Sequence, residues 1–444
     1  MSAMTPHESW GRYPKSQAAQ ILEPAWASDV PDLNQLPHPV LPYGKGRSYG
    51  DCCLNDGGIL LDVSGLDRFI LFDPETGLLR CEAGVTLKTI LELILPANWF
   101  LPVTPGTQFV TVGGAIANDV HGKNHHRAGS FGCHLERFEL LRSDRGKLLC
   151  SRECNRDLFE ATIGGLGLTG LILWAEFQLK RVSGPLIDCE KVRFETLEEF
   201  FELSSSSDKD YEYTVAWLDC MSTGSKRNRG IFLRGNHSAI SGRNSTRRRT
   251  APTLPGFHTP GSLINRPTVR AFNWLYLHSQ LHQRTHNTIH FEKFFYTLDR
   301  IAGWNRFYGK RGFLQYQFLV PYERREGVAE VLDLLAMSRE VCSLTVLKVF
   351  GTIQSPGLLS FPRPGVTLTL DFPFLGESTL ILCEQFDQVV QKHGGAVYPA
   401  KDARMSSKSF QTYFPRWREF LNFVDPCFES DFWRRVATPR PLSQ

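Results

Sequence analysis

The 444-residue chain has no run of about 18 to 20 consecutive apolar residues, the length that a membrane-spanning helix requires. Its first residues also lack the apolar core of a secretion signal. Charge of either sign is not in excess, because 50 lysine and arginine residues face 46 aspartate and glutamate residues, for a formal net charge of +4. These absences predict a cytoplasmic protein that does not bind nucleic acid.

Metal-binding and disulfide frameworks are also missing. The eleven cysteines are an odd number, so complete pairing into disulfides is impossible. Cys150 and Cys154 are four residues apart, but no second cysteine or histidine pair follows at a distance typical of zinc sites. We expect no metal and mostly reduced, buried thiols.

Two common enzyme signatures are not supported. The one GxSxG match, residues 46–50 (GRSYG), lies inside a glycine-rich loop and not at the strand-to-helix turn of a nucleophile elbow, which argues against serine-hydrolase chemistry. It also has no Rossmann fingerprint, because none of its glycine-rich segments opens the helix of a βαβ unit with a ribose-binding acid downstream. A cofactor, if present, is therefore expected to bind through a different loop architecture.

What is present is the composition of a globular protein with a sizeable core, 42% hydrophobic and 22% charged. Alternating apolar residues and glycine-rich turns predict many strands interspersed with helices, which is an α+β fold. The expected strands are 58–62, 78–83, 138–142, 170–179, 213–218, 313–320 and 366–372, and the expected helices are 86–95 with Thr86 as its cap, 324–337 and 378–393.

Residues 236–268 are poor in large apolar side chains, contain four prolines and include Arg247, Arg248 and Arg249. They predict a mobile loop. An aromatic stretch with helical potential follows, up to Leu281. One interpretation is a solvated loop followed by a core helix. The other is a basic and aromatic surface, within 243–282, that makes peripheral contact with an anionic membrane.

Three glycine-rich segments stand out in the first half of the chain. Residues 44–51 (GKGRSYGD) follow a short strand candidate and can present backbone N–H groups to a pyrophosphate, although a plain hairpin turn is the alternative. Residues 105–117 (PGTQFVTVGGAIA) are too rich in glycine and alanine for an ordinary packed helix, and 164–170 (GGLGLTG) precede a strand. Three such segments together favour close approach to a ligand over coincidental turns.

Residues 121–132 (HGKNHHRAGSFG) add three histidines and a lysine. No carboxylate-rich partner set lies nearby and Lys123 would repel a cation, so a metal site is not favoured. Hydrogen bonding to a cofactor or substrate fits better. The segment predicts a bound anion beside a polar reaction centre.

The order and spacing of these four motifs resemble the FAD-binding domain of the vanillyl-alcohol-oxidase (p-cresol-methylhydroxylase-type) flavoproteins. Within that superfamily the motifs resemble most the decaprenylphosphoryl-β-D-ribose 2-oxidases. Further similarity lies at 298–299, 304–305, 308–309, 313–318, 347–351, 371–373 and 398–402. The resemblance covers nearly the whole chain except the basic loop.

The resemblance implies a two-domain flavoenzyme. Its FAD-binding domain would comprise 1–183, completed by 396–444, and a substrate-binding domain with a largely antiparallel sheet would comprise 184–395. The residues implied to contact FAD are Gly44, Lys45, Gly46, Arg47, Ser48, Tyr49, Gly50, Asp51, Gly106, Thr111, Val112, Gly113, Gly114, His121, Gly122, Lys123, Asn124, Ile172 and Tyr398.

The implied reaction is oxidation of a secondary hydroxyl of a sugar or sugar phosphate to a ketone, by hydride transfer to flavin N5. The catalytic candidates are Lys401, His121, Lys123, Tyr49, Gln317 and Lys348, and the substrate pocket candidates are Gln315, Gln317, Thr367, Thr369 and Trp217. Lys401 is either the base, a substrate anchor or a stabiliser of negative charge on the reduced flavin. Loss of Lys401 or His121 is expected to be most damaging, whereas His125 and His126 are expected to be structural.

The chain departs from the family pattern in two places. Thr367 and Thr369 stand where the family often has an asparagine and a cysteine, which leaves open an alditol, an aldonolactone or a natural-product alcohol as substrate. A non-catalytic binding protein on the same fold is a third alternative. The first glycine loop has no histidine for covalent attachment, so FAD is predicted to bind non-covalently. A separate short-chain ketoreductase is the implied partner, completing an epimerisation of a cell-wall polysaccharide precursor.

Overall fold

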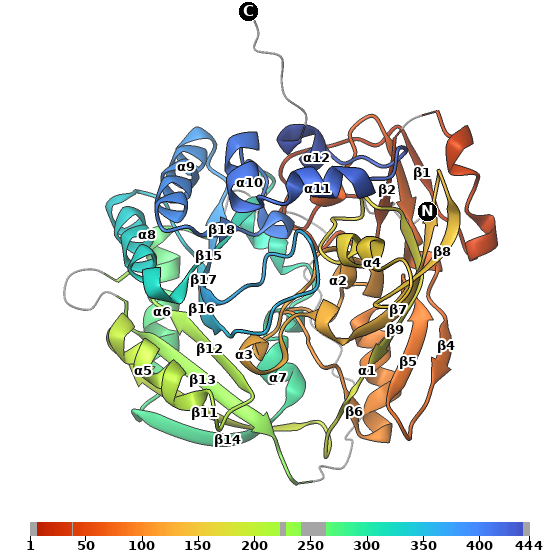
Figure 1. Cartoon of the computed structure of the whole chain (residues 1–444). Helices are drawn as coiled ribbons and strands as arrows, with labels where there is room; N and C mark the ends of the chain where they lie inside the picture. Colours follow the sequence, from red (N-terminus) through yellow and green to blue (C-terminus); the bar gives the residue numbers. More distant parts are fainter. Residues whose placement is uncertain (1–6, 38, 223–227, 241–262, 438–444) are drawn as a thin grey trace, which may run out of the picture.

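The largest element of the computed structural model is an eight-stranded sheet whose neighbouring strands all pair antiparallel (Figure 1). The structure describes residues 7–37, 39–222, 228–240 and 263–437. The strands run in the order β14 (Arg284–His290), β11 (Leu186–Phe194), β13 (Gly230–His237), β12 (Tyr213–Leu218), β16 (Leu344–Phe350), β17 (Gly365–Pro373), β15 (Phe313–Val320) and β18 (Ala396–Val397).

One face of this sheet is apolar and lies under three helices. Because side chains alternate along a strand, Phe318, Leu368 and Leu370 share a face with Phe232 and pack into the largest core cluster. The covering helices are α5 (Leu197–Ser207), α8 (Glu326–Met337) and α9 (Glu377–Lys392), as Figure 1 shows. The opposite face carries the alternate residues, many of which are polar.

A second, five-stranded sheet supports the glycine-rich segments. Its strands run in the order β4 (Phe69–Phe72), β5 (Leu78–Glu82), β9 (Leu171–Gln178), β7 (Leu135–Arg142) and β8 (Gly146–Ser151). The helices α1 (Leu87–Ile94), α2 (Val112–Ala117) and α4 (Arg156–Thr162) contribute buried residues to the core on this sheet. Its central strand β9 begins directly after the glycine-rich segment 164–170.

Three smaller groups complete the described chain. A parallel three-stranded sheet has the order β1 (Gln20–Leu22), β3 (Ile59–Asp62) and β2 (Val40–Tyr43), and β10 (Lys180–Arg181) pairs with β6 (Trp99–Phe100). The remaining α-helices are α3 (His125–Ala128), α6 (Arg266–His278), α7 (Phe291–Phe295), α10 (Ser407–Tyr413), α11 (Trp417–Phe420) and α12 (Asp431–Val436), with short 3-10 turns between elements.

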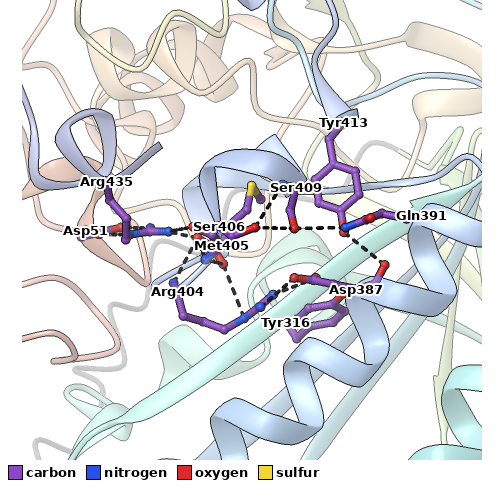
Figure 2. A network of polar contacts seen from close by, with 11 residues as sticks. Asp51, Tyr316, Asp387, Gln391, Arg404, Met405, Ser406, Ser409, Tyr413 and Arg435 are labelled. Carbon is purple, nitrogen blue, oxygen red and sulfur yellow. Dashed lines mark hydrogen bonds and ion pairs between the residues drawn. The ribbon is translucent and has the colours of Figure 1, made fainter. Parts of the chain in front are cut away.

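Ion pairs fix the C-terminal segment to the first glycine loop and to α9. Arg435 on α12 binds the carboxylate of Asp51 through two nitrogens, at 2.9 and 2.7 Å. Arg404 binds Asp387 of α9 through two bonds of 2.7 Å, and the Tyr316 hydroxyl donates to the same carboxylate (Figure 2). These contacts hold the segment just after Lys401 against both the sheet and the first glycine loop.

The predicted strands and long helices agree with the structure to within a few residues, and the α+β class is confirmed. Thr86 caps α1, since its side chain accepts a hydrogen bond from the Thr89 amide. All eleven cysteines carry free thiols, six of them buried. No helix in the described ranges combines the length and apolar character needed to span a bilayer.

Two local predictions were wrong, and the hairpin alternative for residues 44–51 is excluded. Residues 112–117 do form a helix, capped by the Thr111 hydroxyl, because the small residues let α2 pack closely on Ala83. The segment 44–51 is not a hairpin turn, because β2 and β3 pair in parallel. The predicted loop 236–268 is shorter at both ends, since β13 ends at His237 and α6 begins at Arg266. Residues 241–262, with Arg247, Arg248 and Arg249, lie outside the described residues.

The predicted division into domains stays a prediction. Residues 41–60 and α12 both contribute to the core cluster under the eight-stranded sheet. Strand β18, expected in the FAD-binding domain, pairs with β15 at the edge of that same sheet. The two predicted domains thus share one core.

Candidate active site

The polar face of the eight-stranded sheet collects the predicted pocket residues. Directly paired residues of antiparallel strands point to the same side, and Gln315 pairs with Asp371, Gln317 with Thr369, and Lys348 with Thr367. Trp217 belongs to the same row, because it pairs with Val346, which in turn pairs with Thr369. The period-two alternation that buries the core on one side therefore gathers these side chains on the other.

His121 lies against this face as a neutral imidazole. The Gln317 amide donates to His121 Nε2 at 3.0 Å and contacts Thr367 Oγ1 at 3.2 Å. Burial, with Lys348 and other cations adding to it, lowers the pKa of His121 well below its usual range. With Nε2 accepting, the proton is assigned to Nδ1, which has no partner among the described residues. A buried N–H without a partner is costly, so this atom is a ready donor to a ligand.

Lys401 lies over the ring of Tyr49, with Nζ 3.8 Å from the ring centre. Burial lowers the pKa of Lys401 to about 7, although Asp371 opposes the shift. Burial likewise raises the pKa of Asp371 to about 7, and Gln315 Nε2 donates to this carboxylate at 2.5 Å. Two groups whose pKa values lie near neutrality thus interact electrostatically in this site.

Asp371 was not assigned a role from the sequence, although its motif was noted. The available signal is that it is the one acidic residue in β17, a strand of otherwise apolar residues and threonines. Asp371 is fully buried and pairs with Gln315 in the sheet. Burying a carboxylate without a charged partner lowers the stability of the fold, so its presence here indicates a function.

Two more lysines add positive charge to the same region. Burial lowers the pKa of Lys123 to about 7 and that of Lys348 to about 8. The Lys123 ammonium donates to the backbone oxygen of Phe294 on α7 and lies 4.6 Å from that residue's ring centre. Among the described residues, Asp371 is the one carboxylate that opposes the pKa shift of any of these three mostly buried lysines, so the site favours an anionic ligand.

The first glycine loop, residues 44–51, packs between the segment 105–117 and the residues that follow Lys401. A Cβ at Gly44 would approach Thr111 Oγ1 to 2.6 Å, and one at Gly50 would meet the backbone oxygen of Asp402 at 1.6 Å. Around Gly106, by contrast, there is no protein atom within 4 Å of such a Cβ. The loops therefore converge for packing reasons, while Gly106 borders open space.

A cavity of about 730 Å³ opens beside the first glycine loop. Its walls include Gly44, Lys45, Gly46 and Arg47, and the Arg47 guanidinium stacks 4.1 Å from the Trp10 ring centre. Glycine-lined open space beside Lys45 and Arg47 suits a large anionic cofactor. The unpartnered Nδ1 of His121 and the three lysines add a donor and positive charge, although they do not line this cavity. These residues fit FAD.

Some predicted cofactor residues also have partners within the protein. The Asp51 carboxylate is bound by Arg435. Val112 and Ile172 lie in the core of the five-stranded sheet, and the Asn124 amide donates to the Pro102 oxygen. For these and all other residues of the predicted set the contact with FAD stays a prediction.

The other two histidines make packing contacts, and their structural role stays a prediction. His125 stacks on Phe350 with ring centres 4.3 Å apart, and the His126 ring contacts the Tyr211 backbone oxygen at 3.0 Å. Neither belongs to a group with metal-ligand spacing in the described ranges. That spacing is found at His7, Glu23 and Asp62, where His7 and Asp62 are already paired at 2.8 Å.

Comparison with known proteins gives the same cofactor. A model of the FAD-binding domain matches residues 21–150. The chain is 36% identical over 413 residues to a decaprenylphosphoryl-β-D-ribose oxidase of Mycolicibacterium smegmatis, with 89% of each chain covered. It is 34% identical over 376 residues to an uncharacterized protein of Streptomyces coelicolor, covering 80% of this chain and all of the relative.

A more distant similarity covers a much smaller part of the chain. The human Δ24-sterol reductase is 30% identical over 123 residues, which is 28% of this chain and 23% of that protein. The similarity to the oxidase, by contrast, covers 89% of both chains. The chain therefore belongs to the FAD-dependent oxidoreductase family that includes decaprenylphosphoryl-β-D-ribose oxidase.

Proposed function

We propose that this enzyme oxidises a secondary hydroxyl of a sugar linked to a polyprenyl phosphate, giving a ketone. The observation that carries the proposal is the convergence of Lys401, His121 and Asp371 with the polar face of the sheet. Bound FAD supplies the acceptor for the hydride that leaves the carbinol carbon. The relative with 89% coverage bears the name of such an oxidase, which supports the substrate class.

Lys401 is the residue that we propose as acceptor of the hydroxyl proton. A general base works best when its pKa lies near the working pH, and the lowered pKa of about 7 meets this condition. The ring of Tyr49 below Nζ fixes the direction of the amine. Asp371 then acts as a positioning residue that favours the protonated amine after transfer.

The remaining polar groups hold the reactants. His121 Nδ1–H is a donor toward the ligand, and Gln317 keeps the ring in that tautomer. Lys123 and Lys348 supply the charge that an anionic ligand needs in a dry environment. In this proposal the walls of Phe350 and Tyr398 around His121 exclude water from the site.

A different alcohol is the second candidate. Thr367 and Thr369 line the polar face with short hydroxylated side chains, and Thr367 Oγ1 already donates to the Phe318 oxygen. A pocket of this kind also suits a free alditol, an aldonolactone or a natural-product alcohol. Whichever alcohol is used, the ketone formed is a substrate for a separate short-chain ketoreductase, which would complete an epimerisation.

The test is anaerobic reduction of the bound flavin. A polyprenyl-phosphoribose analogue is expected to bleach the flavin absorbance within one turnover, while simple alditols leave it unchanged. Bleaching by the alditols alone would favour the second candidate. A flavin that no alcohol reduces would contradict both.

We also propose that FAD is bound without a covalent link. The first glycine loop has Arg47, Ser48 and Tyr49, and none of these is a histidine. Precipitation of the purified protein with acid should leave a colourless pellet and a yellow supernatant. A pellet that stays yellow after washing would show covalent attachment.

A further inference from the structure

Helix α6 carries apolar side chains on two opposite faces. Its inner face contributes Val269, Asn273 and Leu277, spaced four residues apart and all buried. Leu277 packs against Trp217 and Ile231 of the eight-stranded sheet. Burial of this face accounts for the packing of α6 on the sheet. It does not account for the residues on the opposite face.

The outer face of α6 is apolar as well. Phe272, Trp274 and Leu275 are 56%, 55% and 61% exposed, and Leu281 just after the helix is 86% exposed. Helical periodicity places the first three around the side opposite Asn273. A surface helix normally presents polar residues there, so an exposed group of this size marks an interaction surface.

The surrounding sequence has charge of one sign only. Between Asp219 and Glu292 there is no aspartate or glutamate, while eleven lysine and arginine residues occur in the same stretch. Because the whole chain has a formal net charge of only +4, the rest of it is net negative. Arg270 on α6 is exposed beside the outer face. The apolar group thus lies in a stretch of sequence whose charged residues are all basic.

We propose that the outer α6 face, meaning Phe272, Trp274, Leu275 and Leu281 together with Arg270, docks on an anionic lipid bilayer. Tryptophan and phenylalanine bury well at the headgroup boundary, and arginine adds attraction to anionic lipids. An acidic protein partner would match the positive charge, but it would not require so many exposed apolar side chains on the outer face. The occupant that fits both features is the membrane surface.

The position of α6 connects this surface with the active site. Phe272 stacks on Tyr276, with ring centres 6.1 Å apart, and Tyr276 contacts Trp217 edge to face at 4.8 Å. Trp217 stands on the polar face of the sheet, in the row of Thr369 and Gln317. The docked helix would therefore hold the polar face beside the bilayer in which a polyprenyl-linked substrate is dissolved. This last step rests on the proposed function, whereas the docking does not.

The experiment is flotation of the flavin-loaded, full-length protein with vesicles of phosphatidylcholine, with and without phosphatidylglycerol. The protein should float with the anionic vesicles, less so with added salt, and not with phosphatidylcholine alone. Replacing three side chains (Phe272→Ser, Trp274→Ser, Leu275→Ser) should lower the bound fraction at least about tenfold. The matched control is Ile70→Ser with Leu71→Ser on β4, two residues 49% and 42% exposed, which should float as the wild type does.

Retention of flavin colour in both variants shows that the fold is intact. Equal flotation of the triple variant and the wild type would overturn the proposal, as would a wild type that does not float with anionic vesicles. Sedimentation velocity tests whether a second copy of the chain binds the outer α6 face instead. Self-association that the triple variant abolishes, in a protein that does not bind vesicles, would also overturn the proposal. Because vesicles without substrate are used, failure of the proposed alcohol oxidation leaves this result unchanged.

Discussion

The candidate active site contains three lysines that are mostly buried, although lysine side chains are usually exposed to water. Lys123, Lys348 and Lys401 each have a pKa lowered by burial, to about 7, 8 and 7. An ammonium removed from water without a matching carboxylate destabilises the folded chain. Their presence together is therefore better explained by an anionic ligand than by folding.

The kinetic role of Lys401 can be tested by substitution and pH. Lys401→Met should lower kcat by about 100-fold or more, the usual range for loss of a general base. In the wild type kcat/KM should fall as the pH drops through about 7, because the amine becomes protonated and cannot accept a proton. Stopped-flow flavin reduction across pH 5 to 9, about two units on either side of this pKa, measures both effects.

Lys401→Arg separates the base from a purely electrostatic role. Arginine keeps the positive charge but does not lose its proton in this range. If Lys401 is the base, the arginine variant should be as slow as the methionine variant. Recovery of the wild-type rate by arginine would show that charge alone matters.

Lys348 gives a prediction about stability. A lysine whose pKa falls from 10.5 to about 8 on folding costs stability that is complete below about pH 8 and fades as the pH rises toward 10.5. Lys348→Met in flavin-free protein should therefore raise the free energy of unfolding at pH 7 by up to about 3 kcal/mol. Urea denaturation at pH 7 and pH 10 measures the difference, which should shrink at the higher pH. An equal gain at both pH values would contradict the buried-charge explanation.

At the scale of the element, the glycine loops have two different reasons for lacking side chains. Gly50 is needed by the fold, since its Cβ would meet the Asp402 oxygen at 1.6 Å. Gly106 has no protein atom within 4 Å of the same position and keeps an ordinary backbone conformation there. The sequence shows both as glycine and does not distinguish them.

The two glycines should therefore respond differently to alanine. Gly50→Ala should destabilise the protein by about 3 kcal/mol or more, because the clash is with backbone atoms that cannot turn away. Gly106→Ala should leave the melting temperature of the flavin-free protein unchanged and weaken flavin retention. Thermal melts with and without FAD, together with the flavin content after gel filtration, test the pair. A large loss of stability in flavin-free Gly106→Ala would refute the assignment.

At the scale of the whole molecule, the two predicted domains both contribute to the largest core cluster. The cluster under the eight-stranded sheet takes residues from the first glycine loop region, the sheet, α9 and α12. Arg404 and Asp387 are both buried where the C-terminal segment meets α9. Lys401, three residues before Arg404, depends on this junction for its position.

Unfolding should therefore be a single cooperative transition, in spite of the two predicted domains. Asp387→Leu leaves Arg404 buried without its partner and should lower the free energy of unfolding by about 3 to 5 kcal/mol. Flavin fluorescence and far-ultraviolet circular dichroism, followed together in urea, should change at the same midpoint in both proteins. Two separated transitions would show that the predicted domains unfold independently.

The amino-acid sequence by itself determined the α+β class, the main strands and helices, and the family with its cofactor. These follow from local periodicity and from short motifs, which need no knowledge of distant contacts. Helix α2 was missed because it is only six residues long and contains two glycines, which are unfavourable in a helix, while its close packing on Ala83 is a tertiary contact.

Only the tertiary structure decided which of the predicted residues meet. Sheet register brought Asp371 opposite Gln315, within reach of Lys401, although these residues belong to different elements. It also paired Asp51 with Arg435, 384 residues away, a contact that no local pattern in the sequence indicates. Lowered pKa values and an apolar outer helix face depend on burial, and burial is a property of the folded chain.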